Sequence, residues 1–416
     1  MASRKLTAVA FIAAGTLAFT ACGAQVDNTA ASSAGASDSL GTCVDTSGSS
    51  IKIGFVNSLS GTMAISEKTV SDSLHMAADE INAAGGVNGK TLEVIQEDGA
   101  SEPTIFAEKA EKLISQDCVA AVFGGWTSAS RKAMLPVFEE KDSLLFYPVQ
   151  YEGLEASPNI FYTGATTNQQ IIPAMDYLKS QGISKLFLVG SDYVFPRTAN
   201  KIINAYAAAN GIEIVGEEYA PLGHTDFSTI VNKLKGSGAQ AVFNTLNGDS
   251  NVAFFKEYKN AGLSADSMPV TSVSIAEEEV GGIGLENVEG QLAAWNYFQT
   301  LDSPENAKFV EDFKAKYGQD RVTSDPMEAA YTSLYLWKAM AEKAGGFSTE
   351  DITAAADGVT FDAPEGTVTV NGDNHHISKT ALIGRIESDG LLHVVWTSGS
   401  PIEPDPFLKS YSWWQG

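Results

Sequence analysis

The sequence predicts an α/β protein of two lobes, each a mainly parallel β-sheet flanked by helices. Two observations lead to this fold class. Short runs of β-branched and aromatic residues alternate with segments whose apolar residues recur every three or four positions, and this alternation restarts near the middle of the chain. The roughly 365 residues that follow a polar N-terminal stretch also exceed what one hydrophobic core usually holds.

The first series of elements begins at residue 51. Its predicted strands are 51–56, 91–95, 119–124 and 144–147. The helix after the first strand has Val70, Leu74 and Ile81 on one apolar face, and the glycine-rich turn at 85–89 ends it. Two further helices are expected around 107–114 and 132–139. Repeated β-α-β units imply parallel strands with helices on both faces of the sheet.

The second series repeats this layout without repeating the sequence. Its predicted helices are 169–181, 198–210, 227–236 and 251–261, and its predicted strands are 185–190, 213–219, 239–245 and 269–273. The last part of the chain departs from the alternation. Two consecutive helices, 305–317 and 326–344, precede strands near 366–370, 381–386 and 391–395.

The N-terminus has the pattern of an export signal peptide, residues 1–21. Arg4 and Lys5 precede an apolar run that is too short to span a bilayer of ~30 Å. Small residues then precede Cys22, as in the lipoproteins whose cysteine carries a diacylglycerol, although Phe19 stands where leucine is usual. The alternative is a secretory signal whose cysteine is incidental. With the lipid, the exported protein is anchored to the outer face of the cytoplasmic membrane.

Residues 22–50 are predicted to form a flexible tether. They are dominated by Ala, Ser, Gly, Asp and Thr, which cannot bury enough apolar surface to offset the entropy of ordering. No later stretch offers about 18 uninterrupted apolar residues, so the sequence predicts no membrane span beyond the signal.

The charge balance limits the possible partners. The chain has 27 basic and 51 acidic residues and a formal net charge of −24. Nucleic acids and anionic membrane surfaces bind proteins rich in Lys and Arg, so neither is expected as a partner.

Two cysteines remain if Cys22 is acylated. Cys43 lies just before the first predicted strand, and Cys118 lies just before the strand 119–124. If these strands are parallel neighbours, both cysteines emerge at the same end of the sheet, and an exported protein rarely keeps free thiols. We therefore predict a Cys43–Cys118 disulfide; the alternative is two separate buried thiols.

The sequence contains no convincing catalytic set. It has no G-x-S-x-G elbow, no H-E-x-x-H helix and no P-loop. Adjacent His375 and His376 point to different sides of a strand or turn, which makes a poor metal pair. The acidic run 277–279 is interpreted as a solvated helix start, with Glu277 alone facing the binding site. We predict no enzyme, no metal site and no cofactor.

Ligands of open α/β sheets bind beyond the carboxyl ends of the strands. Two lobes that face each other with these edges would enclose one cleft. The predicted strand ends are 58–64, 124–130, 147–152, 191–195, 246–251 and 274–277.

Several motifs, in order along the chain, carry a resemblance to a known family. They are 81–90 (INAAGGVNGK), 124–132 (GGWTSASRK), 145–153 (LFYPVQYEG), 157–162 (SPNIFY), 168–170 (NQQ) and 190–197 (GSDYVFPR). Together they resemble the urea/short-chain amide branch of the type I solute-binding proteins, which includes the urea-binding lipoproteins of urea ABC importers. The similarity runs from about residue 51 to 407.

The resemblance implies a type I periplasmic-binding-protein fold with three hinge crossovers, expected near 162–167, 294–299 and 345–360. The corresponding N-lobe is 51–166 plus 298–350, the C-lobe is 167–297 plus 351–407, and 408–416 is a C-terminal tail. We expect a monomer that delivers a small neutral ligand to ABC permease subunits.

Urea is the expected ligand. It has one carbonyl acceptor and several N–H donors, so a dry site must offer both donors and acceptors. By family position, Ser128 is expected to bond the carbonyl, Tyr147 and Tyr193 to enclose the flat molecule, and the oxygen of Gln150 to accept an N–H. The full set of expected ligand-binding residues is Trp126, Ser128, Tyr147, Gln150, Tyr193, Phe195, Asn247, Asp249 and Glu277.

Three alternatives stay open at this point. The ligand is a short-chain amide or a branched-chain amino acid; the protein is a membrane-attached sensor with the same binding site; or, least favoured, it is an amide hydrolase.

Overall fold

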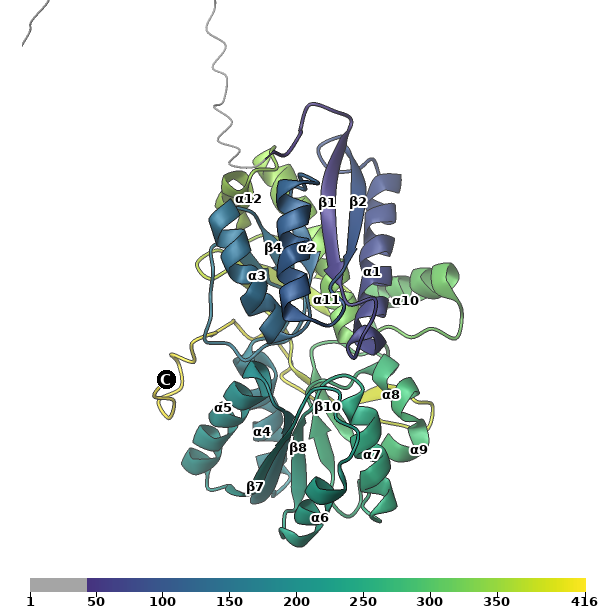
Figure 1. Cartoon of the computed structure of the whole chain (residues 1–416), viewed down its shortest axis with the longest axis vertical. Helices are drawn as coiled ribbons and strands as arrows, with labels where there is room; N and C mark the ends of the chain where they lie inside the picture. The colour runs from purple at the N-terminus through teal and green to yellow at the C-terminus, as the bar shows by residue number, and fades with distance from the viewer. Residues whose placement is uncertain (1–42) are drawn as a thin grey trace, which may run out of the picture. The chain divides into compact units, whose positions relative to one another are not determined.

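The structure, a computed structural model, describes residues 43–416 and contains two β-sheets flanked by helices (Figure 1). The eight-stranded sheet has the order β11-β12-β13-β5-β4-β3-β1-β2, and the seven-stranded sheet has the order β15-β14-β10-β9-β8-β6-β7. This is the two-lobed α/β architecture that the sequence predicts. The predicted signal peptide, lipid attachment at Cys22 and most of the tether lie outside the described residues.

The N-lobe is built on the eight-stranded sheet. Its strands from β2 to β13 are parallel, and β11 and β12 extend the sheet in antiparallel pairing. Helices α1 and α11 pack together on this sheet, and α2 packs against α3. The strands are β1 (Ser50–Asn57), β2 (Thr91–Asp98), β3 (Val122–Gly124), β4 (Leu145–Tyr147), β5 (Ile160–Tyr162), β11 (Thr360–Ala363), β12 (Gly366–Asn371) and β13 (His376–Ile377). The helices are α1 (Ala64–Ala83), α2 (Pro103–Ser115), α3 (Ser128–Lys141), α10 (Pro304–Tyr317), α11 (Asp325–Ala344) and α12 (Thr349–Ala356).

The C-lobe is built on the seven-stranded sheet. Strands β7, β6, β8, β9 and β10 are parallel, and β14 and β15 are antiparallel to their neighbours. One apolar core lies under α4 and α5, and a second lies under α6 and α7. The strands are β6 (Lys185–Ser191), β7 (Glu213–Ala220), β8 (Ala241–Thr245), β9 (Val270–Ser272), β10 (Leu292–Trp295), β14 (Leu382–Ile386) and β15 (Leu392–Thr397). The helices are α4 (Ile171–Ser180), α5 (Val194–Asn210), α6 (Ser228–Gly236), α7 (Ser250–Asn260), α8 (Glu277–Ile283) and α9 (Leu285–Val288), with the short η1 (Thr167–Gln169) before α4.

The chain passes between the lobes three times, and the third passage differs from the prediction. The first passage runs from β5 of the N-lobe to α4 of the C-lobe, and the second runs back from β10 to α10. The third runs from β13 of the N-lobe to β14 of the C-lobe. The third crossover is therefore 378–381 and not 345–360, and strands β11, β12 and β13 belong to the N-lobe, although 351–407 was assigned to the C-lobe. The β11–β12 hairpin packs on α11, where Phe361 stacks on Tyr335 with ring centroids 4.9 Å apart.

A buried polar network joins the crossovers. Lys379, in the third, forms an ion pair of 2.6 Å with Glu365 and donates to the carbonyl of Thr163 in the first. Asn296, in the second, donates its side-chain N–H groups to the carbonyls of Gln169 in the first and Thr380 in the third. Because each group is bonded to another segment, the three crossovers form one structural unit.

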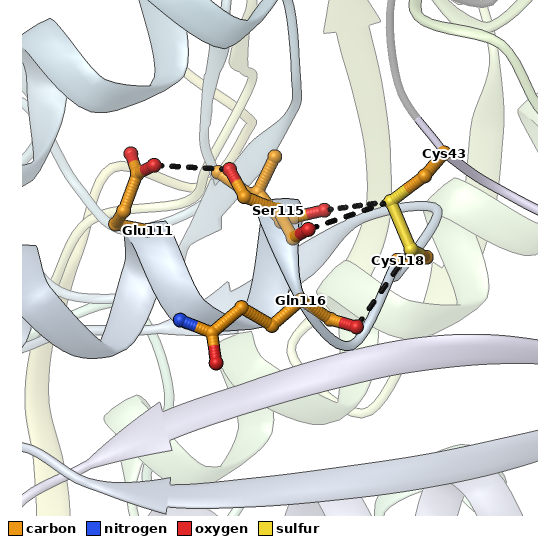
Figure 2. Close-up of a disulfide and its surroundings, with 6 residues drawn as sticks. Cys43, Glu111, Ser115, Gln116 and Cys118 are labelled. Carbon is orange, nitrogen blue, oxygen red and sulfur yellow. Dashed lines mark hydrogen bonds between the residues drawn. A yellow bond between two sulfur atoms is a disulfide. The ribbon is translucent and has the colours of Figure 1, made fainter.

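A disulfide fixes the start of the described chain to the N-lobe (Figure 2). Cys43 is bonded to Cys118, with a Cα–Cα distance of 5.1 Å, and this is the pair that the sequence predicts. Cys118 follows the end of α2, and the β1 and β3 strands that come after the two cysteines are parallel neighbours. The bridge lies at the amino ends of these strands, the opposite edge of the sheet from the predicted site.

Candidate functional site

The carboxyl ends of β1, β3 and β4 lie side by side in the N-lobe. Val56 pairs with Gly124, and Phe123 pairs with Phe146, so the residues that follow each strand share one edge. Gly124 has a φ of +124°, and a Cβ at this position would lie 2.2 Å from the Val56 carbonyl oxygen. Only glycine permits this close approach. The turn delivers Trp126 and the first residues of α3 to the edge.

A buried ionic network lies at the start of α3. Arg131 is fully buried, and its Nε donates to Glu155 over 2.7 Å while its Nη2 lies 3.1 Å from Glu152. Ser128 accepts from Arg131 Nη1 over 2.9 Å and donates to Glu152 over 2.5 Å. The Ser128 hydroxyl proton is therefore directed at Glu152 and not at a ligand carbonyl, which was its expected partner. Its remaining lone pair can accept an N–H.

The charge of Arg131 is compensated within the N-lobe. Burial alone would raise the pKa of Glu155, but Arg131, followed by Lys132, lowers this pKa to about 2. The guanidinium also lies over the rings of Tyr147 and Tyr151, 5.1 Å and 4.5 Å from their centroids, where the aromatic faces attract a cation. The network is complete without a ligand anion.

Beside this network lie buried polar atoms that have no hydrogen-bond partner within residues 43–416. They are both side-chain atoms of Asn57, the indole N–H of Trp126 and the Oε1 of Gln150. All three residues are at most 3 % exposed. Because buried polar groups in proteins are nearly always hydrogen-bonded, each of these atoms calls for a partner beyond the described side chains, either a water molecule or a ligand. We call these three residues the open polar group.

Tyr147 and Tyr193 lie on the two sides of this region. The Tyr147 hydroxyl donates to the carbonyl of Trp126, and burial raises the Tyr147 pKa, so the phenol stays neutral. Tyr193 follows β6 in the C-lobe. Burial, followed by the nearby Tyr147 and Glu152, raises its pKa well above the usual range. Since these neighbours belong to the other lobe, the Tyr193 side chain faces the N-lobe site, and no side-chain hydrogen bond is found for it within the described residues.

Gln150 makes the direct contact between the lobes at this place. Its Nε2 donates to the carbonyl of Val273 over 2.8 Å and to the Ser274 hydroxyl over 2.9 Å. Both acceptors follow β9 of the C-lobe. Gln150 therefore contacts the C-lobe with its nitrogen, and its buried oxygen has no partner within the described residues.

The other C-lobe candidates have different surroundings. Phe195 is buried in the core under α5, its ring 6.4 Å from that of Tyr193. Asn247 is buried and donates to the carbonyl of Thr245. Asp249 is exposed and lines a surface hollow with residues of α7, including Lys256. The structure does not bring Asp249 to the open polar group.

The acidic run at the start of α8 is buried, so its interpretation as a solvated helix start is wrong. Glu277 and Glu279 are 2 % and 1 % exposed. Glu277 accepts from the backbone N–H of Gln299 over 2.8 Å, and burial raises its pKa to about 8. Glu279 accepts from the hydroxyl of Ser66 on α1 of the N-lobe. The run therefore contacts the N-lobe, and burial raises the pKa of each of its carboxyls.

Some residues of this region were not predicted from the sequence. Asn57 is the last residue of β1, one position before the segment expected at that strand end. Arg131 and Glu152 lie within the family motifs, but neither was given a role. An arginine and a glutamate in motifs that end buried strands were the available signal, since a buried charge requires a partner.

The histidines have structural roles. His376 stacks on Tyr162 with ring centroids 4.3 Å apart, and His375 stacks on Phe161. Burial lowers the pKa of His376 to about 3. Within residues 43–416, no group of three or more His, Cys, Asp or Glu side chains is arranged to hold a metal ion.

Residues 51–412 match the family described as periplasmic binding protein domain, and the chain belongs to this family. Membership implies an exported protein. The chain is 26% identical over 371 residues to "Leu/Ile/Val-binding protein homolog 6" of Brucella melitensis, which covers 86% of this chain and 94% of the relative. No helix of the described part of the chain is long and apolar enough to cross a membrane.

Solved structures of transporter solute-binding proteins share the fold. One, from Rhodopseudomonas palustris HaA2 in complex with p-hydroxybenzoic acid, is 27% identical with a TM-score of 0.78 and covers 87% of this chain and 100% of that chain. Another, a branched-chain amino acid transporter substrate binding protein of Streptococcus pneumoniae in complex with isoleucine, is 24% identical with a TM-score of 0.75 and covers 85% and 100%. These similar proteins are binding proteins of transporters rather than enzymes.

Proposed function

We propose that this protein is the extracytoplasmic solute-binding component of an ABC importer and that it captures urea, or a short amide of the same shape, between its lobes. The observation that supports this proposal most strongly is the open polar group, Asn57, Trp126 and Gln150. It presents both donors and acceptors and carries no net charge. A ligand that satisfies it must both accept and donate hydrogen bonds, as a neutral amide does.

Urea matches this requirement group by group. Its carbonyl oxygen needs donors, and the indole N–H of Trp126 and the amide NH₂ of Asn57 supply them. Its N–H groups need acceptors, which the oxygens of Asn57 and Gln150 supply. The rings of Trp126 and Tyr147 would provide the flat apolar walls that a planar molecule requires.

The state of Arg131 argues against an anionic ligand. The carboxylate of a benzoate or an amino acid is bound most strongly by a cation, and Arg131 is the buried cation near this site. Its guanidinium is already bonded to Glu152, Glu155 and Ser128. Opening these contacts for a ligand would leave two buried carboxylates unpaired, which costs several kcal/mol.

The proposed mechanism is capture by closure, without chemistry on the ligand. Urea binds first to the N-lobe edge, and the C-lobe closes over it about the three crossovers. Closure is favoured only to the extent that the ligand or the lobes themselves make contacts that the open form lacks. The closed form would then dock on permease subunits, and the lipid on Cys22 would hold the protein at the membrane surface.

Calorimetric titration tests the ligand assignment. We expect the purified protein to bind urea more tightly than isoleucine or p-hydroxybenzoate, with formamide and acetamide next to urea. No ammonia should be released on prolonged incubation with urea. Tighter binding of isoleucine or p-hydroxybenzoate would overturn the assignment, and ammonia release would show an amide hydrolase instead.

A further inference from the structure

The Gln150 side chain has two N–H donors and one acceptor oxygen, and the structure uses only the two donors. Both N–H groups of its amide are directed at the C-lobe, to Val273 and Ser274. The oxygen is buried and has no partner within the described residues. The Gln150 side chain is therefore bonded to the C-lobe through its nitrogen and keeps an unpaired acceptor in its oxygen.

The orientation of this amide is fixed by its surroundings. The carbonyl of Val273 can only accept a hydrogen bond, so a rotated amide would place two oxygens against each other and lose this bond. The Gln150 oxygen is therefore directed away from the Val273 carbonyl whenever this contact is made. At this point the site calls for a hydrogen-bond donor on the ligand, and a carbonyl oxygen or methyl group cannot take its place. In urea and the short amides that donor is an N–H group.

The contact between Gln150 and Val273 joins the two lobes, and the coupling requires that closure forms it. Closure without a donor would bury the Gln150 oxygen unpaired, which is unfavourable. Closure over a ligand N–H pairs it. Hydrogen bonds in such a chain also polarise one another, so a bond to the oxygen strengthens those made by the nitrogen.

We infer that Gln150 couples the recognition of a ligand N–H group to the closure of the two lobes, and that it selects for ligands with an N–H at this position. This inference rests on the proposed function as a binder of urea or short amides. It adds that one side chain, Gln150, would both accept a hydrogen bond from the ligand and donate hydrogen bonds to the C-lobe.

The chain provides a matched control in Gln170. Its Nε2 donates to the same Val273 carbonyl over 3.2 Å and to the carbonyl of Ala294 over 2.7 Å. Gln170 immediately precedes α4 of the C-lobe, and its bonds do not reach the N-lobe site. Replacing it removes a partner of Val273 without removing the link between lobes.

The test measures urea affinity by calorimetry and lobe closure by the radius of gyration in X-ray scattering. The full protein is compared with Gln150→Met, Gln150→Glu and Gln170→Met. We expect both Gln150 variants to lose at least about tenfold in affinity and to show no ligand-induced compaction. Gln170→Met should compact on urea as the wild type does. Ser274→Ala, a milder change at the same contact, should reduce affinity in the same direction and serves if a Gln150 variant fails to fold.

A second comparison tests the selection for N–H. Acetamide and acetone have nearly the same shape, but only acetamide has N–H groups. Wild type should bind acetamide and not acetone, and Gln150→Met should lose most of this discrimination. Compaction of Gln150→Met and Gln150→Glu by urea at wild-type affinity would overturn the inference. If the wild type ignores urea but closes on another N–H ligand through Gln150, the proposed ligand is wrong and the inference stands; if it closes on no N–H ligand, both fall.

Discussion

The two lobes bring acidic residues to the same interface in opposite ways. In the N-lobe, Glu155 is paired with Arg131, which lowers its pKa to about 2 and keeps it charged. In the C-lobe, Glu277 is buried among backbone groups with no cation bonded to it, and burial raises its pKa to about 8. The start of α3 is therefore a charge-compensated network beside which a ligand can be placed. At Glu277 the raised pKa favours a neutral carboxyl, which can be separated from its partners without exposing an unpaired charge.

This contrast indicates that the two lobes have different roles in binding. The N-lobe holds a rigid, self-compensated network at the start of α3, next to the open polar group. The C-lobe reaches this region through Tyr193 and through Val273 and Ser274. We expect the N-lobe to determine what binds and the C-lobe to determine whether it stays. Four predictions test this division, from the largest expected effect to the smallest.

Removing the cation of the N-lobe network should cause the largest loss. In Arg131→Met, Glu152 and Glu155 would stay buried without their partner, and breaking such a pair costs about 3–5 kcal/mol. We expect a large drop in the thermal unfolding temperature, or failure to fold. The control is Lys132→Met, since Lys132 is 42% exposed in its ion pair with Glu155 and should matter little. Equal stability of Arg131→Met and wild type would contradict the network's structural role.

Changing the open polar group should affect binding rather than stability. Trp126→Phe removes the indole N–H and keeps an aromatic ring, and Asn57→Leu removes both a donor and an acceptor. We expect each to weaken urea binding at least about tenfold, roughly 1.4 kcal/mol, while the unfolding temperature stays the same or rises. Calorimetric affinities at or near the wild-type value would place the ligand elsewhere.

The pH dependence of stability should show both kinds of carboxyl group. Burial raises the pKa of Glu277 and of Glu67 on α1 to about 8, from an ordinary value of 4.5. The folded state therefore holds protons that the unfolded state has lost, and stability falls as the pH rises from about 4.5 to about 8. Glu155 acts in the opposite direction, since its stabilisation is lost as the pH falls from about 4.5 toward 2.

Thermal unfolding between pH 4 and 9 measures this dependence; urea denaturation is unsuitable because urea is the proposed ligand. We expect the highest unfolding temperature near pH 5. Glu67→Gln and Glu277→Gln should each flatten the decline toward pH 8. A stability that rises steadily from pH 5 to pH 8 would show that these carboxyls are ionised in the folded protein.

The smallest effect is expected at Asp249. It is exposed and lines a surface hollow of the C-lobe away from the open polar group. Asp249→Asn should leave urea affinity within about twofold of wild type, a difference of roughly 0.4 kcal/mol. A tenfold loss in the titration would show that the C-lobe contributes more to recognition than the contrast between the lobes implies.

Much of the fold could be predicted because alternating patterns report burial directly. The strand predicted at 51–56 is β1, that at 185–190 is β6, and the helix predicted at 326–344 is α11. The disulfide followed from parallel neighbours that bring Cys43 and Cys118 to one end of the sheet. In each case, periodicity or adjacency along the chain carries the information.

The third crossover and the acidic run could not be predicted for a related reason. The residue pattern of the sequence predicts that β12 is a strand, but it does not predict which of the two sheets the strand joins. The β11–β12 hairpin packs on α11, and this contact assigns it to the N-lobe. Likewise, the run 277–279 has the composition of a solvated helix start. Its burial depends on the opposite lobe, through partners such as Ser66, more than 200 positions away in sequence.

The site was predicted unevenly for the same physical reason. Trp126, Tyr147, Gln150 and Tyr193 lie in motifs at strand ends, and the structure places them at the facing edges of the lobes. Asn57 has no motif around it and is distinguished only by being buried without a partner. Such a property belongs to three-dimensional packing and not to residue type.

A crystal structure of the protein grown with urea tests the central claim most directly. We predict closed lobes and a urea molecule whose carbonyl lies about 2.7–3.2 Å from Trp126 Nε1 and whose N–H points at the Gln150 oxygen. Arg131 should keep its bonds to Glu152 and Glu155. Urea bound elsewhere, or a carboxylate ligand seated on an Arg131 released from these partners, would contradict the account.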